Sequence, residues 1–267
     1  MILLLGMALA TKASVAALGE DSGGPHLLAL NPKVGPSDFA TRGDLQAVLV
    51  RLLEQAQEQD LLRQRTVVVL PRHVGHWLIV ANRHARVYSS RTASVAAFRA
   101  GMVTPARYLA ALASTRVTED ALVRVQGDEA VGIWERICTR LADHYDVWLA
   151  GGSATNGVGE EVFGLWDPAG ERVGDDTWAT PAGEVRLGPV VALEHQSVTA
   201  TMHGRMWDRP AGEGMAVAAL GEQRLESQAQ LISVWLPPPS VPRPTPDGRP
   251  LRSPPEERTG EDSPAIR

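Results

Sequence analysis

The sequence predicts an α/β protein whose helices and strands are stacked in layers. Apolar residues recur at spacings of three and four along residues 45–56 and again along residues 131–145, which predicts two amphipathic helices. Residues 67–70 are three valines and a leucine, a run too uniformly apolar for an exposed edge strand. Strands that alternate with helices along a chain are typical of a layered α/β domain.

The other elements follow in chain order. A short strand is predicted over residues 26–30, and Thr41 with Asp44 forms a capping box before the first helix, which we expect to end near Gln59. Residues 94–113 are rich in alanine and predict a helix that is interrupted near Pro105. The remaining predicted strands cover residues 147–150, 162–166, 184–193, 214–220 and 231–236.

Both ends of the chain differ in composition from its middle. Residues 1–25 are predicted to be an apolar extension, in which the run at residues 2–10 is shorter than the roughly 20 residues of a membrane-spanning helix. No basic residue precedes this run, so a vestigial export signal and a frayed extension are both open interpretations. Residues 26–236 form the predicted domain. Residues 237–267 hold ten prolines in 31 residues and predict a disordered tail.

Charge and cysteine content exclude several classes of protein. The net charge is −5 and no dense stripe of basic residues is present, so nucleic acid is not an expected partner. The single cysteine, Cys138, excludes an internal disulfide and a cysteine-based metal cluster, and no cofactor is expected. We expect a cytoplasmic protein and no membrane partner, with export or membrane association through the apolar N-terminus as the alternative.

Four segments, read together, resemble the nitrilase (carbon–nitrogen hydrolase) superfamily. Residues 67–77 (VVVLPRHVGHW) are similar to the strand that ends in Pro-Glu, and residues 133–153 (IWERICTRLADHYDVWLAGGS) to the helix and strand that close on Gly-Ser. Residues 162–173 (VFGLWDPAGERV) resemble the strand with Asp-Pro-x-Gly. Residues 209–220 (RPAGEGMAVAAL) resemble the turn and strand that lead to the nucleophile.

This resemblance implies a nitrilase-like αββα sandwich that often dimerises through its sheets. It also implies cleavage of amides, nitriles or carbamoyl groups by glutamate, lysine and cysteine. In that chemistry a thiolate attacks the electrophilic carbon, the glutamate moves the proton, and the lysine stabilises the oxyanion.

None of the three catalytic residue types stands at its implied position. The glutamate position falls on Arg72, whose guanidinium has no acceptor and cannot act as a base. The lysine position falls on Leu187. The nucleophile position falls on Ala218, or on Ala192 in an alternative register.

The resemblance also implies that the sandwich is truncated at its C-terminus. Only 49 residues follow Ala218, and most of them belong to the proline-rich tail. An incomplete sandwich would leave a sheet edge exposed, so we expect a homo-oligomer that covers it.

The turn after residues 67–70 supplies the candidate binding residues Arg72, His73, His76 and Trp77. Arginine binds carboxylates through its planar fork, so a small anionic or amide ligand is the hypothesis for this site. His73 and His76 could suit a metal ion, but no third ligand is placed by the sequence, and no metal is expected.

The sequence therefore favours a non-catalytic member of the superfamily with a binding or assembly role. The alternative is an active amidase- or nitrilase-type hydrolase with unusual residues, in which Arg186 would stabilise the oxyanion and Cys138 would be the nucleophile. We expect Cys138 to be a core residue instead, because it shares a helix face with apolar residues. A chain without a selected role is the third possibility.

Overall fold

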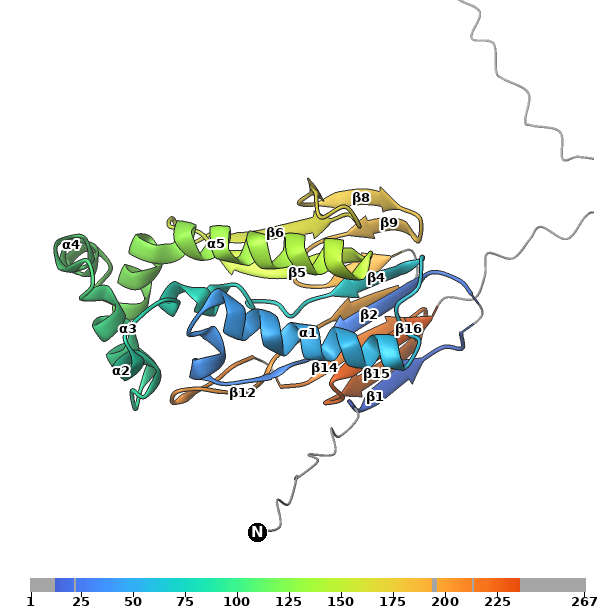
Figure 1. Ribbon diagram of the computed structural model, residues 1–267, viewed down its shortest axis with the longest axis horizontal. Coiled ribbons are helices and arrows are strands. Elements are labelled where there is room, and N and C mark those ends of the chain that lie inside the picture. Colours follow the sequence, from blue (N-terminus) through green and yellow to red (C-terminus); the bar gives the residue numbers. More distant parts are fainter. Residues whose placement is uncertain (1–12, 22, 194–195, 213, 236–267) are drawn as a thin grey trace, which may run out of the picture.

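The computed structural model of the chain describes residues 13–21, 23–193, 196–212 and 214–235. Its fold is mixed α/β, as expected, and consists of one layer of helices and two packed sheets (Figure 1). The helical elements are η1 (Pro36–Phe39), α1 (Arg42–Glu58), η2 (His76–Val80), α2 (Ala85–Tyr88), α3 (Ala93–Gly101), α4 (Pro105–Thr115) and α5 (Thr118–Tyr145).

The main sheet has seven strands in the order β1-β16-β2-β4-β5-β6-β7. Its centre is parallel, because β2 pairs with β4 and β4 pairs with β5 in the same direction, whereas the flanking pairs β16–β2 and β5–β6 are antiparallel. The strands are β1 (Val15–Leu18), β16 (Leu231–Trp235), β2 (His26–Leu30), β4 (Thr66–Val69), β5 (Trp148–Thr155), β6 (Glu161–Trp166) and β7 (Arg172–Gly174).

The second sheet is antiparallel throughout, in the order β15-β14-β11-β10-β9-β8. A small third sheet has three strands in the order β13-β12-β3. The strands of these two sheets are β8 (Thr177–Thr180), β9 (Gly183–Arg186), β10 (Val191–Leu193), β11 (Gln196–Thr199), β14 (Ala216–Leu220), β15 (Gln223–Ser227), β3 (Lys33–Val34), β12 (His203–Met206) and β13 (Arg209–Pro210).

Side-chain alternation along the central strands explains the layering. In β4, Val68 belongs to the core shared with α1 and α5, whereas Val67 and Val69 belong to the core shared with the second sheet. Successive strand residues point to opposite faces, so a strand with both faces buried must be apolar at every position. This is why residues 67–70 form an unbroken apolar run.

Most of the elements predicted from periodicity are confirmed. The first helix begins after Thr41, whose side chain accepts a hydrogen bond from the Asp44 backbone N–H at 3.2 Å, and it ends at Glu58. The helix over residues 94–113 is interrupted before Pro105, as expected, into α3 and α4. The helix over residues 131–145 is the second half of the longer α5.

Three boundaries differ from the sequence predictions. Residues 184–193 are not one strand: β9 and β10 pair antiparallel, because Gly188 and Pro189 interrupt the run. The strand predicted over residues 147–150 continues to Thr155. Residues 15–18, predicted to lie in the N-terminal extension, form the edge strand β1, which pairs with β16.

After α5 the described part of the chain forms strands and their connections, with no further helix. In the same described part, no helix combines the length and the apolar character needed to cross a membrane. The run at residues 2–10 and the proline-rich tail at residues 237–267 lie outside the described residues.

Candidate functional site

The main pocket of the molecule is built around the turn that follows β4. Pro71 has no N–H to continue the sheet, and the chain then reverses direction. The N–H of Val74 donates to the carbonyl of Pro71 at 3.3 Å, and that of His76 to the carbonyl of His73 at 3.0 Å. His73 adopts a left-handed backbone (φ 62°) at the apex of this turn.

Two glycines allow this turn to lie against β5. A Cβ atom on Gly152 would stand 2.1 Å from the carbonyl oxygen of Pro71, and the residue has φ +67°. A Cβ atom on Gly75 would stand 2.5 Å from the Cβ atom of Ala154. Only glycine fits at either position without displacing the backbone.

An irregular register in β5 directs two hydroxyls toward the turn. The pairing of β5 with β6 shifts between Ala150 and Ser153. Beyond the shift, the Ser153 hydroxyl accepts a hydrogen bond from the backbone N–H of His73 at 3.0 Å. Thr155 pairs directly with Glu161 of β6, so both side chains are brought to the same end of the sheet.

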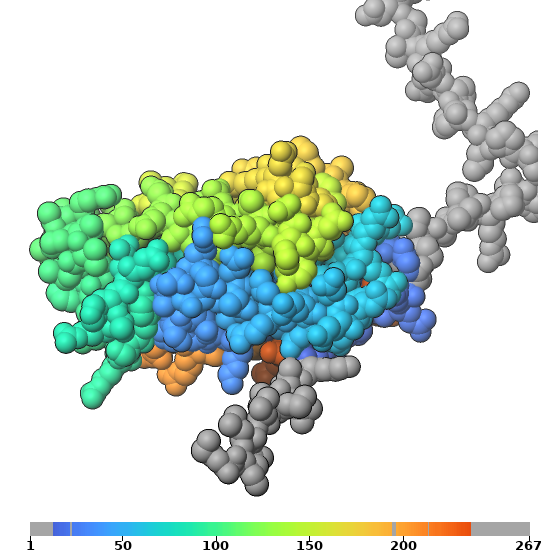
Figure 2. Space-filling model, in the orientation of Figure 1, coloured from blue at the N-terminus to red at the C-terminus, as the bar shows by residue number. Residues whose placement is uncertain are grey.

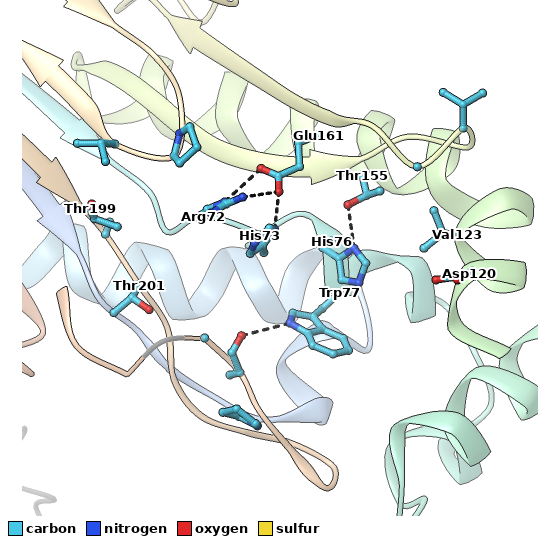
Figure 3. A pocket seen from close by; sticks show the side chains of 18 of the residues that line it. Arg72, His73, His76, Trp77, Asp120, Val123, Thr155, Glu161, Thr199 and Thr201 are labelled. Carbon is cyan, nitrogen blue, oxygen red and sulfur yellow. Dashed lines mark hydrogen bonds and ion pairs between the residues drawn. The ribbon is translucent and has the colours of Figure 1, made fainter. Parts of the chain in front are cut away.

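Thr155 and Glu161 line a cavity of about 1140 Å³ together with residues of the turn after β4, and we call it the Arg72 pocket (Figure 3). Its walls come from the turn after β4, the start of α5, the ends of β5 and β6, and the backbone around β10, β11 and β13. All four residues predicted to bind a ligand line it: Arg72, His73, His76 and Trp77.

Arg72 is held by a carboxylate of the same chain. Its Nε and Nη2 atoms donate to the two oxygens of Glu161 at 3.2 and 2.8 Å, a bidentate arrangement. His73 Nδ1 lies 3.5 Å from Glu161 Oε1. Burial by itself raises the pKa of Glu161, but the hydrogen bond from Arg72 and the charges of His73 and Arg72 outweigh it, and the pKa is lowered. A small anionic or amide ligand at Arg72 stays a prediction, and such a ligand would meet a guanidinium that is already paired with Glu161.

His76 forms a second polar pair in the pocket. Its Nδ1 atom lies 2.8 Å from the hydroxyl of Thr155 (Figure 3). Burial, followed by the charge of His73, lowers the pKa of His76 to about 4. The imidazole is therefore neutral at physiological pH and can accept or donate a hydrogen bond.

Trp77 fixes the opposite wall of the pocket. Its indole N–H donates to the carbonyl oxygen of Ala211 at 3.4 Å, and its ring meets that of Trp207 edge-on at 5.9 Å. These contacts tie η2 to the residues on either side of β13. The ring offers an apolar surface beside the polar pairs.

Two charged residues of α5, Asp120 and Arg124, lie at the rim of the pocket, and both are exposed. No acidic side chain of the described residues lies within ion-pair distance of Arg124. Arg124 can therefore offer its charge to a ligand at the rim, one helical turn from the Asp120 carboxylate.

The other implied catalytic positions lie away from the pocket. Leu187 packs beside the core between the two sheets, and Ala218 is buried in that same core. Ala192, in the alternative register, is in β10 and does not line the pocket. Of the implied positions of glutamate, lysine and cysteine, Arg72 lines the pocket, and Leu187 and Ala218 do not.

The residues of the hydrolase alternative are also placed elsewhere. Cys138 is fully buried on α5, and burial raises the pKa of its thiol well above the ordinary value. It packs against Gly151 and Trp134, so its predicted core role is confirmed. Arg186 is exposed on β9, outside the pocket lining.

Sequence reasoning missed Glu161 and Thr155, which complete the two polar pairs. Asn156-Gly157, between two apolar segments, was a signal that could have found them, because this dipeptide is typical of a hairpin turn. A hairpin about that turn places the residues that flank it opposite each other.

Among the described residues, no three His, Cys, Asp or Glu side chains are grouped as metal ligands would be. Comparisons of the chain with protein-family models, with curated proteins and with solved structures give no match. What the pocket does is therefore inferred from its own geometry.

Proposed function

We propose that the chain is a non-catalytic protein of the carbon–nitrogen hydrolase type, and that it binds a small amide or carbamoyl compound in the Arg72 pocket. The bidentate pair of Arg72 and Glu161, at the end of β4 and β6, carries this proposal. The cavity of about 1140 Å³ is large enough for such a ligand, since small-molecule pockets span roughly 300–1000 Å³.

The ion pair is complementary to an amide. A guanidinium supplies only donors and an ionised carboxylate only acceptors, and here the two groups lie side by side on the pocket wall. An amide carries both an acceptor oxygen, which can face the guanidinium, and a donor N–H group, which can face the carboxylate. A lone carboxylate would instead have to compete with Glu161 for the guanidinium.

The rim favours an acidic group at the far end of the ligand. Arg124 is exposed there and has no acidic partner among the described residues. A ligand with an amide at one end and a carboxylate at the other would satisfy both Arg72–Glu161 and Arg124.

The lack of catalysis in this proposal rests on residue chemistry. Arg72 cannot accept a proton, Leu187 carries no charge, and Ala218 offers no nucleophile. The layer of helices on two packed sheets supports the carbon–nitrogen hydrolase type, because it corresponds to three of the four layers of an αββα sandwich.

The test is calorimetric titration of the purified chain with a panel of primary amides and carbamoyl compounds, with and without a terminal carboxylate. We expect saturable binding of at least one member, weakened roughly tenfold to a hundredfold by Glu161→Gln, because a hydrogen bond to a charged group contributes about 1.5–3 kcal/mol.

The exposed pair of Arg224 and Glu226, 2.8 Å apart on β15, provides the matched control. Glu226→Gln removes a comparable carboxylate outside the pocket and should leave the affinity unchanged. Equal losses for both variants, or no binding across the panel by a folded sample, would refute the proposal.

One observation favours a second candidate, a hydrolase that uses Thr155 and His76. A hydroxyl within hydrogen-bond reach of a neutral imidazole is the arrangement of a nucleophile with its base. With its proton on Nε2, His76 would accept the Thr155 proton at Nδ1 as the hydroxyl oxygen attacks the amide carbon and the carbonyl electron pair moves onto its oxygen. The imidazolium would then give that proton to the amide nitrogen as the C–N bond breaks and ammonia leaves, and water would hydrolyse the resulting ester.

Ammonia release from primary amides distinguishes this candidate from binding alone. Hydrolysis through the pair would be lost in Thr155→Val and in His76→Gln, and kept in Thr199→Val, which removes another hydroxyl of the same pocket. Release that survives Thr155→Val would exclude Thr155 as the nucleophile.

A further inference from the structure

Residues 81–118 carry positive charge without any negative charge. This segment contains no Asp or Glu, whereas the whole chain has a net charge of −5. Its cationic residues are Arg83, Arg86, Arg91, Arg99, Arg107 and Arg116. Such separation of charge within a chain indicates a surface for an anionic partner.

The segment lies at one end of the molecule. Helices α2, α3 and α4 project together beyond the ends of the sheets (Figure 1), and the space-filling view shows them as a protruding end without a groove on the visible face (Figure 2). We call residues 81–118 the helical tip. Only one of its residues, Thr115, lines the Arg72 pocket.

Large apolar side chains are exposed on the same tip. Val95 and Phe98 are exposed on α3, followed by Met102 and Val103 in the connection and Leu109 on α4; Val103 is 56% exposed. Residues 95, 98 and 102 follow helical spacing and share one face. The Phe98 ring meets Tyr108 of α4 edge-on at 6.2 Å, so the apolar residues of both helices are neighbours.

The arginines of the tip are not neutralised by nearby carboxylates. Within the described residues only Arg83 has an acidic partner, Glu129 at 3.5 Å. Arg99 donates to the carbonyl of Arg86 at 2.9 Å, a contact that leaves its charge in place.

Glu119, the carboxylate just beyond the tip, is already engaged. It lies 2.9 Å from Arg209 and accepts a hydrogen bond from Ser94 at 3.0 Å. The Arg83 side chain is only 10% exposed, whereas the other five arginines of the tip are exposed and their charges face solvent.

We propose that the helical tip binds to the surface of membranes that contain anionic lipids. The five exposed arginines would lie among the phosphate and carboxylate groups of the lipids, and Phe98, Met102, Val103 and Leu109 would enter the boundary with the acyl chains. Exposed apolar residues flanked by arginine are the composition of interfacial helices, and each basic residue near an anionic surface adds attraction.

The shape of the tip favours lipid over other anionic partners. A partner helix is usually held in an apolar groove, and the tip is convex where Figure 2 shows it. Nucleic acid is bound through phosphates and base edges, which exposed aliphatic side chains such as Val103 and Leu109 do not recognise.

The test is sedimentation of the full chain with vesicles of phosphatidylcholine alone and of phosphatidylcholine mixed with phosphatidylserine. We expect the chain to sediment only with the mixed vesicles and to be released by salt. Arg107→Ala should lower the partition coefficient about fivefold, the effect of removing one basic residue from such a surface. The double variant Met102→Asp with Val103→Asp should abolish sedimentation.

Two exposed residues of the second sheet region serve as matched controls, Arg224→Ala for charge and Met215→Asp for apolar surface. Both should sediment like the parent chain, and unchanged melting temperatures would show that every variant is folded. Equal binding to both vesicle types, no binding to the mixed vesicles, or equal loss in the controls would overturn the proposal. Binding of polyglutamate without binding of vesicles would also overturn it and would assign the tip to an acidic protein.

Discussion

At the scale of single residues, burial decides which groups can change charge. His26 is fully buried at the start of β2, where it lies 3.0 Å from the Thr66 hydroxyl and 2.9 Å from the Ser233 hydroxyl, and its ring stacks on Trp235 at 3.7 Å. Burial, which outweighs the opposing charge of Asp21, lowers the pKa of His26 to about 3. The folded protein therefore keeps this imidazole neutral.

This burial predicts a loss of stability in acid. Between pH 6.5 and about 3 the unfolded chain binds a proton at His26 and the folded chain does not, so the free energy of unfolding falls as the pH falls. The contribution is up to about 1.4 kcal/mol per pH unit. Denaturation of His26→Asn across this range should show a correspondingly shallower pH dependence, and an unchanged slope would contradict the assignment.

At Gly152, the steric cost of an added methyl group can be measured separately from the cost of the left-handed backbone. Gly152→Ala would place a methyl group 2.1 Å from the Pro71 carbonyl oxygen at φ +67°, so we expect a loss of about 2 kcal/mol or more in the free energy of unfolding. Gly221→Ala is the matched control, because Gly221 has φ +57° and no atom within 4 Å of the added methyl. Equal losses measured by denaturant titration would show that contact with Pro71 is unimportant.

Cys138 predicts a difference in thiol reactivity between the folded and unfolded chain. Its thiol is fully buried and its pKa is raised by burial, so little thiolate is present or accessible. A chromogenic disulfide reagent should react with it only after denaturation. Rapid reaction with the native protein would restore Cys138 as a candidate nucleophile.

At the scale of elements, hydrophobic periodicity predicted the helices and the central strands because their pattern follows from burial. Residues 45–56 are apolar on the one helix face that is buried, and residues 67–70 are apolar throughout because both faces of their strand are buried. The split of residues 184–193 into β9 and β10 was missed, although Gly188-Pro189 marks it, because an apolar run does not show where a chain turns back.

Part of the candidate site could be predicted from neighbouring residues, and part depends on residues far apart in the sequence. Arg72, His73, His76 and Trp77 are adjacent in the sequence, so their shared location follows from one turn. Glu161 reaches Arg72 across 89 positions, through the pairing of β4 with β5 and of β5 with β6. That long-range register cannot be obtained from the local pattern around either residue.

The first helix offers a test of local structure. The Thr41 hydroxyl accepts from the Asp44 N–H at 3.2 Å and donates to its carboxylate at 2.7 Å. Thr41→Ala should therefore lower the free energy of unfolding by about 1 kcal/mol, and Thr41→Ser should restore most of it. Denaturant titration measures both, and no difference between the two variants would contradict the capping role.

At the scale of the whole molecule, the Arg72 pocket and the helical tip are neighbours with different proposed functions, since Thr115 of the tip lines the pocket. The Arg72 pocket opens where β4 and β5 end and β6 begins, and the helical tip projects beyond the sheets. The edge strands β1 and β7 have only four and three residues, which limits edge-to-edge pairing. Self-association through the sheets stays a prediction, to be checked by light scattering.

The central claim is that the Arg72 pocket binds an amide or carbamoyl compound without cleaving it. The direct measurement is ammonia release by the folded chain, followed in the presence of the compound that binds most tightly in calorimetry. We predict saturable binding, weakened by Glu161→Gln, and no ammonia above that of a heat-denatured sample. Ammonia that increases with protein concentration and disappears in Thr155→Val would contradict the claim and identify a hydrolase.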